Sequence, residues 1–248
     1  MPQLAAAAAR PCDPAGKLVA VVSESRPAAS GTRAGRGASE PEAIDIGPLV
    51  AAEHPAAADL LARAFRDNPL NRAVIGRGPT ARVRSNFHGA RASLLAVEGS
   101  ALLLAARERT SPGVAPVAVL IAVAPFGHPR RRPPTWVQIR SLLGQGIRTA
   151  RRWTRVHRLF SAIHPIEPHW YLSILGVDPR RQHRGVGSAL LREWLCRVDA
   201  ENAPSYLETD RPENVAFYRR EGFEVARELR IMGVQIWCMW RAARNPAG

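Results

Sequence analysis

The alternation of hydrophobic and polar positions along the chain predicts a mixed α/β protein. Short apolar runs bounded by Gly and Pro are typical of strands buried on at least one face. Runs of this kind occur at 101–106, 117–124 and 170–177, and the shorter segments 43–46 and 205–209 are two further predicted strands. Apolar residues at helical spacing predict helices in the segments between them. The helical segments are 55–65, 82–97, 136–163, 190–198 and 212–223.

Residues 1–42 differ from the rest of the chain in composition. Ala, Pro, Gly, Ser and Arg dominate this segment, and it has one brief apolar patch at 18–22. Too few apolar residues are present to offset the entropy of ordering, so the segment is predicted to be a disordered low-complexity tail. Residues 43–248 are long enough for one domain with a sizeable core.

The three cysteines and the hydropathy indicate where the protein resides. Cys12, Cys196 and Cys238 lack the spacing of metal ligands and fit unpaired thiols in a reducing compartment. No stretch has the features of a signal peptide or the length of a membrane span. We therefore expect a cytoplasmic protein with no metal and no membrane partner, as a monomer or homodimer.

The net charge of +14 is concentrated in part of the chain. The segment 125–165 holds nine arginines and no acidic residue. They are Arg130, Arg131, Arg132, Arg140, Arg148, Arg151, Arg152, Arg155 and Arg158. Such a run is usually the solvated face of a helix. The alternative is an electropositive rim that attracts a polyphosphate, an acidic acceptor or nucleic acid. Gly144 and Gly146 allow this long helix to bend.

The segment 169–191 combines a strand, a basic loop with glycines and the start of a helix. Gly185 and Gly187 let the backbone approach an anion closely, and the helix N-terminus favours negative charge. Arg181 and Arg184 add guanidinium groups that can bind phosphate oxygens. These features predict an anion-binding loop, although an ordinary strand–turn–helix connection fits the local sequence equally well.

A second motif separates these alternatives. The sequence Gln182-His183-Arg184-Gly185-Val186-Gly187 resembles the acetyl-CoA loop of the GNAT N-acetyltransferases, with His183 where many members have glycine. Asn214 and Tyr218, ahead of Gly222-Phe223, match a second signature of that superfamily. The resemblance covers about 43–241 and is strong after His169. It extends to the branch that includes puromycin N-acetyltransferase, through the segments around 169–172, 207–209, 217–218 and 237–239.

The resemblance implies a fold and a set of binding residues. The fold would be a mostly antiparallel sheet of six to seven strands, splayed between the fourth and fifth, with helices on both faces. The fourth strand is 170–177, and the long helix 136–163 would roof the acceptor pocket. The residues expected to bind acetyl-CoA are Leu175, Gly176, Val177, Arg181, Gln182, His183, Arg184, Gly185, Val186, Gly187, Ser188, Asn214 and Tyr218.

The same resemblance implies direct acetyl transfer without a protein nucleophile. Tyr218 is the expected acid for the leaving thiolate, or else a packed aromatic beside Phe217. Glu208 is the first choice of base, or else a structural strand carboxylate. His169 and Tyr171 share one face of the fourth strand, and either could relay a proton.

The function expected from these residues is acetylation of the primary amine of a small molecule. One alternative is a protein or peptide amine as acceptor. Another is a non-catalytic basic module that binds nucleic acid or regulates other proteins. The presence of both motifs argues against the module and makes a nucleic-acid partner unlikely on sequence grounds.

Overall fold

The computed structural model describes residues 19–20, 44–97, 101–108, 115–125 and 135–244. Most of the predicted tail therefore lies outside the described residues, as do Cys12 and the arginines Arg130, Arg131 and Arg132. Among the residues described, no helix combines the length and the hydropathy that crossing a membrane would require.

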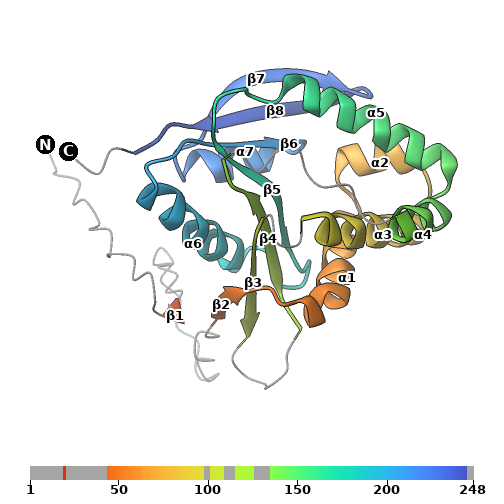
Figure 1. Cartoon of the computed structure of the whole chain (residues 1–248), viewed down its shortest axis with the longest axis horizontal. Coiled ribbons are helices and arrows are strands. Elements are labelled where there is room, and N and C mark those ends of the chain that lie inside the picture. Colours follow the sequence, from red (N-terminus) through yellow and green to blue (C-terminus); the bar gives the residue numbers. More distant parts are fainter. Residues whose placement is uncertain (1–18, 21–43, 98–100, 109–114, 126–134, 245–248) are drawn as a thin grey trace, which may run out of the picture.

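One mixed sheet runs through the molecule, and its strand order is β1-β2-β3-β4-β5-β6-β8-β7. All neighbouring strands are antiparallel except β5 and β6, which are parallel (Figure 1). The strands are β1 Val19–Ala20, β2 Ile44–Pro48, β3 Leu102–Glu108, β4 Ala118–Val123, β5 Trp170–Val177, β6 Ser205–Thr209, β7 Glu224–Ile231 and β8 Val234–Arg241. The predicted mixed α/β fold is confirmed, and the two-residue β1 adds a strand to the expected six to seven.

Helices cover both faces of the sheet (Figure 1). They are α1 His54–Ala64, α2 Pro69–Ile75, α3 Pro79–Val97, α4 Thr135–Gln145, α5 Ile147–Ile163, α6 Val186–Ala200 and α7 Pro212–Arg219, with a 3-10 turn at Ala51–Glu53. One core lies under α6 and α7, and a second lies under α1 and α3. A third, smaller core joins α2 and α5 to β7 and β8.

The sequence pattern located most of these elements, and it located β5 and β6 to the residue. The segment 136–163 forms two helices because Gly146, with φ of +83°, separates α4 from α5. The predicted helix 212–223 ends earlier, at Arg219. The pattern did not predict α2, β7 or β8. The strand β7 is exposed along most of its length, so its sequence lacks the apolar run that marks a buried strand.

An ion pair made by a buried arginine fixes α6 against the sheet. Arg241 at the end of β8 is only 2% exposed and donates two hydrogen bonds to Asp199 of α6, at 2.6 and 2.8 Å. Its Nε also donates to the backbone oxygen of Glu221, after α7. One guanidinium therefore holds α6 and the α7–β7 turn to the sheet. These two helices carry the motifs recognised in the sequence.

Candidate active site

The sheet opens between β5 and β6. The two parallel strands pair at Trp170–Ser205, Tyr171–Tyr206 and Leu172–Leu207. Beyond this point β5 continues to Val177 without β6 beside it, although it stays paired with β4 as far as Val177. The backbone of β5 after Leu172 therefore has one edge that β6 does not occupy. The expected splay between the fourth and fifth strands of the family fold is present here.

A bulge in β5 coincides with the opening. Ile174 pairs with Ile121 and Leu172 with Ala122, so β5 has one residue more than β4 at Ser173. A bulge bends the strand and changes which side chains face each side. Before it, Trp170 and Leu172 pack in the core under α6; after it, Leu175 and Val177 face that core, and Ile174 joins the core under α1.

The loop after β5 has the backbone geometry of an anion cradle. Gly185 is the N-cap of α6, with φ of +78°, and the first intrahelical bond runs from Ala189 N to Gly185 O. The N–H groups of Val186, Gly187 and Ser188 therefore lack partners within the helix and lie at the positive end of its dipole. This arrangement fits a phosphate group.

His183 also adopts a left-handed conformation, with φ of +63°. This conformation is strained for most side chains and costs glycine almost nothing. Its backbone angle gives a physical reason for the glycine that many members of the resembling superfamily carry here. The spacing of the loop is kept because His183 accepts the strain, and the imidazole is left exposed at the loop surface.

Two predicted cofactor residues hold the loop in place. The Gln182 amide donates to the backbone oxygen of Val177, at 3.1 Å, and ties the loop to the end of β5. Arg181 forms a two-pronged ion pair with Glu108 of β3, at 2.5 and 2.7 Å. Its guanidinium thus already neutralises a carboxylate. Binding of phosphate by Arg181 stays a prediction, as it does for the exposed Arg184.

Close packing explains the predicted glycines at both ends of the loop. A Cβ on Gly176 would lie 2.5 Å from Leu61 Cδ2 of α1, so any larger residue would force the buried Leu61 side chain to shift. A Cβ on Gly187 would lie 3.3 Å from Val177 Cγ2, a tight contact between α6 and β5. Both glycines therefore have packing roles, whether or not the pantetheine arm passes beside them.

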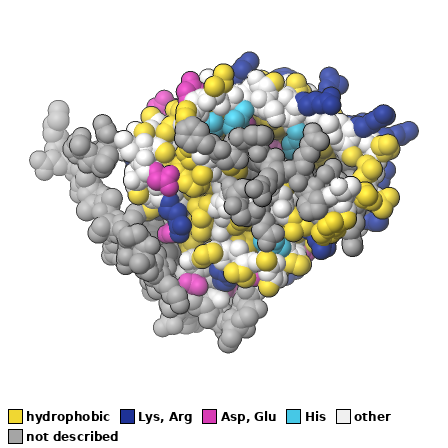
Figure 2. Space-filling view, viewed as in Figure 1, with side chains coloured by type: hydrophobic (Ala, Val, Ile, Leu, Met, Phe, Trp, Pro, Cys, Tyr) yellow, Lys and Arg dark blue, Asp and Glu magenta, His cyan; other side chains and the backbone are white. Residues whose placement is uncertain are grey.

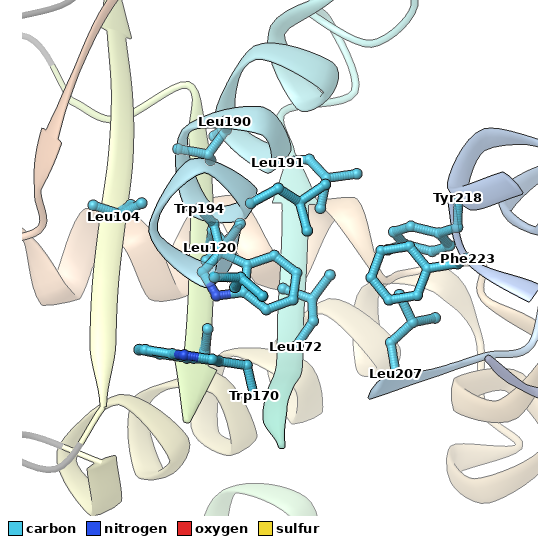
Figure 3. Close-up of a cluster of buried hydrophobic side chains, with 14 of the residues drawn as sticks. Leu104, Leu120, Trp170, Leu172, Leu190, Leu191, Trp194, Leu207, Tyr218 and Phe223 are labelled. Carbon is cyan, nitrogen blue, oxygen red and sulfur yellow. The ribbon is translucent and has the colours of Figure 1, made fainter. Parts of the chain in front are cut away.

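Tyr218 lies on the buried side of α7. In Figure 3 its ring is next to Phe223 and near Leu207 of β6. The ring contacts Phe217 and Phe223, with centroids 5.0 and 5.8 Å away, and burial raises the pKa of the phenol. The group stays protonated over the physiological range as a result. One turn earlier, Asn214 donates to Thr209 Oγ1 at 3.1 Å and so joins α7 to the end of β6.

Glu208 meets Tyr171 on the opposite face of the sheet, away from Tyr218. The Tyr171 hydroxyl donates to Glu208 Oε2 at 2.8 Å, across the point where the strands separate. Both side chains are half-buried. The neighbouring Tyr206 is 2% exposed, and its pKa is raised by burial and by the negative charge of Glu208. A carboxylate and a phenol are thus hydrogen-bonded at the opening.

A histidine pair extends this cluster. His169 Nδ1 lies 2.6 Å from the backbone oxygen of Glu167, and its Nε2 lies 3.2 Å from His164 Nε2. A carbonyl only accepts, so Nδ1 of His169 carries the proton, and in the neutral ring Nε2 accepts from His164. Burial lowers the pKa of His169, which favours that neutral form. The sequence analysis identified His169 but not His164, which the end of α5 brings to the cluster.

Asp210 is a second group that the sequence analysis missed. It follows β6 directly, and its carboxylate accepts from the backbone N–H of Leu70 at 2.8 Å and from the Asn68 amide at 3.4 Å. Burial raises the pKa of this carboxyl group. The bonds attach the start of α2 to the end of β6, beside the opening. A carboxylate at a strand end was the available signal in the sequence.

We expect Asp210→Ala to destabilise the protein by about 1–2 kcal/mol, because the Leu70 N–H at the start of α2 loses its acceptor. Asp210→Asn is the matched control, since its amide oxygen can still accept and its size is unchanged. Chemical denaturation measures both variants. Equal stability of Asp210→Ala and the native protein would show that the bond to Leu70 adds nothing.

The described residues contain no group of three or more His, Cys, Asp or Glu side chains arranged to hold a metal ion. The groups at the opening are instead suited to moving protons. They comprise the protonated phenol of Tyr206, the Tyr171–Glu208 pair and the two histidines. The phenol of Tyr218 lies in the core under α7, on the other face of the sheet. The anion cradle lies at the far end of the β5 overhang from this cluster.

Comparison with known proteins gives this arrangement a family context. The model of the Acetyltransferase (GNAT) domain matches residues 150–225, from α5 to the start of β7. This range includes β5, the loop, α6, β6 and α7, and so contains both motifs recognised in the sequence.

Solved structures share the fold over most of the chain. An acetyltransferase of Corynebacterium glutamicum, described as histone acetyltransferase HPA2 and related acetyltransferase, has a TM-score of 0.61 and 21% identity, over 82% of this chain and 98% of its own. The putative arylalkylamine N-acetyltransferase 7 of the yellow fever mosquito has 0.54 and 13%, over 82% and 88%. Arylalkylamine N-acetyltransferase 2 of Aedes aegypti has 0.52 and 13%, over 81% and 99%. These likenesses concern the fold, and the family model adds the activity: residues 150–225 match a GNAT acetyltransferase domain, which makes the protein an acyltransferase.

Proposed function

We propose that the protein transfers the acetyl group of acetyl-CoA to the primary amine of a small molecule, by direct attack in a ternary complex. The observation that carries this proposal is the opening between β5 and β6, with an anion cradle at one end and a carboxylate–phenol pair at the other. Acetyl-CoA would supply the thioester carbon that the amine attacks. The protein must then bind it, position the amine and move two protons.

Two elements would bind the thioester substrate: the edge of β5 that β6 leaves open, and the loop that follows β5. Backbone groups of Leu175, Gly176 and Val177 on this edge would pair with an extended pantetheine arm, as an added strand pairs with a sheet. The N–H groups of Val186, Gly187 and Ser188 would face the pyrophosphate, together with His183 and Arg184 at the loop surface. A backbone N–H of β5 in this stretch would stabilise the oxyanion.

The Tyr171–Glu208 pair is the proposed route for the proton of the attacking ammonium. Only the free amine is nucleophilic, so a base must accept a proton before or during attack. The carboxylate of Glu208 is half-buried at the opening and accepts a hydrogen bond from Tyr171. The pair His164–His169, which packs edge-to-face against Tyr171 and Tyr206, would pass the proton outward.

Tyr218 is the proposed acid for the departing thiolate. Its phenol reaches the core between β6 and α7, on the face opposite Glu208, so the two proton transfers would occur on opposite sides of the thioester. A raised pKa keeps the phenol protonated until the thiolate forms. The Asn214–Thr209 bond fixes α7 and with it the position of Tyr218.

The nature of the cluster favours a small amine with an apolar body. Tyr171 contacts Glu208, and the rings of Tyr206 and Trp240 continue the aromatic cluster from Tyr171, with ring centroids 6.0 and 6.5 Å apart. Aromatic faces and a carboxylate attract an ammonium group. The end of α5 supplies His164 to the same cluster, which agrees with a role of the 136–163 segment in acceptor choice. We place the protein in the branch that includes puromycin N-acetyltransferase on the sequence motifs alone.

Replacement of Gly185 by Val tests the cradle. We expect acetyl-CoA affinity to fall at least about tenfold, because valine is strained at the left-handed φ of Gly185 and the loop must shift. Gly233→Val is the matched control: it places valine at φ of +80° in the β7–β8 turn, where no atom lies within 4 Å. Gly233→Val should lower the free energy of unfolding by a similar amount and leave the affinity for acetyl-CoA unchanged. Full acetyl-CoA binding by Gly185→Val would remove the cradle from the proposal.

The proposed function itself is tested by incubating the protein with acetyl-CoA and a panel of small primary amines, and by measuring thiol release. We expect one class of aromatic or apolar amine to stimulate release, with intersecting double-reciprocal plots as a ternary complex requires. Acetylation of peptides alone, with no small amine accepted, would replace the small-molecule acceptor by a protein. Parallel plots would contradict direct transfer and indicate an acetylated enzyme.

A further inference from the structure

The corner formed by α4 and α5 exposes apolar side chains that the fold leaves without a partner. The exposed fractions are Trp136 52%, Ile139 52%, Leu142 42%, Leu143 76% and Ile147 62%. The four on α4 follow one another at intervals of three, three and one residues, which places them on one side of the helix. Isolated exposed apolar residues are ordinary, but a contiguous set marks an interaction surface.

Other side chains already pack α4 and α5 on the rest of the molecule. The helix α5 uses Trp153, Val156 and Phe160 to pack on α2 and the β7–β8 hairpin. The helix α4 packs on α3 through Gly144, where a Cβ would collide with the ring of His88. Each helix therefore already has a side turned to the molecule, and the apolar corner is on the outer side.

A row of arginines continues from this corner along α5. Ile147, Arg151, Arg155 and Arg158 recur every three or four residues on the exposed side of the helix, and Arg148 lies next to them. The chain has no acidic residue from 109 to 166. Within the part of the chain that is described, these arginines form no ion pair with a carboxylate. Figure 2 shows basic side chains along the edge over α5, and hydrophobic ones at the right end near α4.

We propose that this α4–α5 corner, comprising the five apolar side chains and Arg148, Arg151, Arg155 and Arg158, binds the surface of an anionic lipid bilayer. Apolar side chains including a tryptophan would enter the interfacial region, and the arginines would contact lipid phosphates. The sequence contains no stretch long enough to span a bilayer, and on that ground no membrane partner was expected. Attachment at the surface requires no such stretch.

The shape and charge of the corner favour a bilayer over other occupants. Four of the five apolar side chains are more than half exposed, so the corner is convex and offers no groove for a peptide. A second copy of the chain would bring two rows of arginine together, and like charges oppose that contact. Nucleic acid would contact the arginines and leave the apolar side chains in water. A negatively charged bilayer matches both features, and this inference depends on the fold alone, whatever the acceptor amine.

Vesicle sedimentation of the full chain tests the proposal. We expect binding to vesicles of phosphatidylcholine with about 30% phosphatidylglycerol, and at least about tenfold weaker binding to phosphatidylcholine alone. Leu143→Ser/Ile147→Ser and Arg151→Gln/Arg155→Gln should each weaken binding to the anionic vesicles about tenfold. Added salt should weaken it as well, because the attraction of the arginines is screened.

The controls remove equal charge or apolar area elsewhere. Arg192→Gln/Arg197→Gln lowers the net charge by the same amount on α6, and Val50→Ser/Met232→Ser removes two exposed apolar side chains away from the corner. Both variants should bind anionic vesicles as tightly as the native protein does.

The proposal is overturned if the native protein does not bind anionic vesicles, or if the α6 charge variant loses as much affinity as the α5 variant. Unchanged binding by Leu143→Ser/Ile147→Ser would also overturn it, since adhesion would then be purely electrostatic. Thermal unfolding verifies that each variant is folded. If Leu143→Ser/Ile147→Ser does not fold, the single variant Leu143→Ser is measured in its place.

Discussion

Replacing Tyr218 by Phe is expected to lower turnover by about two orders of magnitude, the usual contribution of a positioned proton donor. The ring and its contacts with Phe217 and Phe223 are retained, so the fold and acetyl-CoA affinity should change little. Steady-state kinetics with calorimetric titration of acetyl-CoA separates the two effects. A loss confined to turnover identifies a group that acts in the transition state.

The pH dependence of turnover by the native enzyme is a second test of Tyr218 as the acid. Burial raises the pKa of the phenol, and the acid is active only while protonated. Turnover should therefore show no decline between pH 7 and about 10, the ordinary pKa of tyrosine. If Tyr218→Phe turned over like the native protein, Tyr218 would be a packed aromatic beside Phe217 and the acid would have to be found elsewhere.

Glu208→Gln is expected to lower kcat/KM about a hundredfold at pH 7, and Tyr171→Phe by a smaller factor, because both form the proposed route for the ammonium proton. The pKa of a primary amine is about 10.4, so the fraction of free amine rises about tenfold with each unit of pH below that value. The deficit of Glu208→Gln should consequently shrink as the pH rises. Rates measured between pH 7 and 10 test this behaviour.

The strand carboxylate Glu228 on β7 offers a matched control for Glu208. It is exposed and hydrogen-bonded to Gln235, and Glu228→Gln should leave kcat/KM unchanged at every pH. A deficit of Glu208→Gln that stayed constant with pH would point to a structural carboxylate. In that case the base would be sought in Asp210, whose carboxyl pKa is raised by burial beside the opening.

The sequence predicted the elements that carry strong local signals. β5 is a mostly apolar run, and β6 centres on the apolar pair Tyr206 and Leu207. The glycines around α6 and at Gly146 lie at left-handed or tightly packed positions, which glycine fills without strain. The conformation of the loop thus follows from residues that lie next to each other in the chain. The separation of β5 from β6 was expected from the family resemblance and is visible in the pairing.

The rest depends on contacts between distant parts of the chain, which no local pattern encodes. Arg181 was expected to bind phosphate, but its ion pair with Glu108 joins residues on different strands. His164 reaches His169 only because α5 ends beside β5, and Asp210 reaches Leu70 only because α2 begins beside β6. The short α2 was missed because a proline-led helix of two turns has too few apolar positions to show a period.

Calorimetric titration of the full chain with acetyl-CoA tests the central claim most directly, because every proposed role at the opening requires that molecule to bind there. We predict saturable binding of one acetyl-CoA per chain, weakened in Gly185→Val and unchanged in Gly233→Val. Absence of binding by a protein whose circular dichroism shows the mixed α/β fold intact would contradict the account.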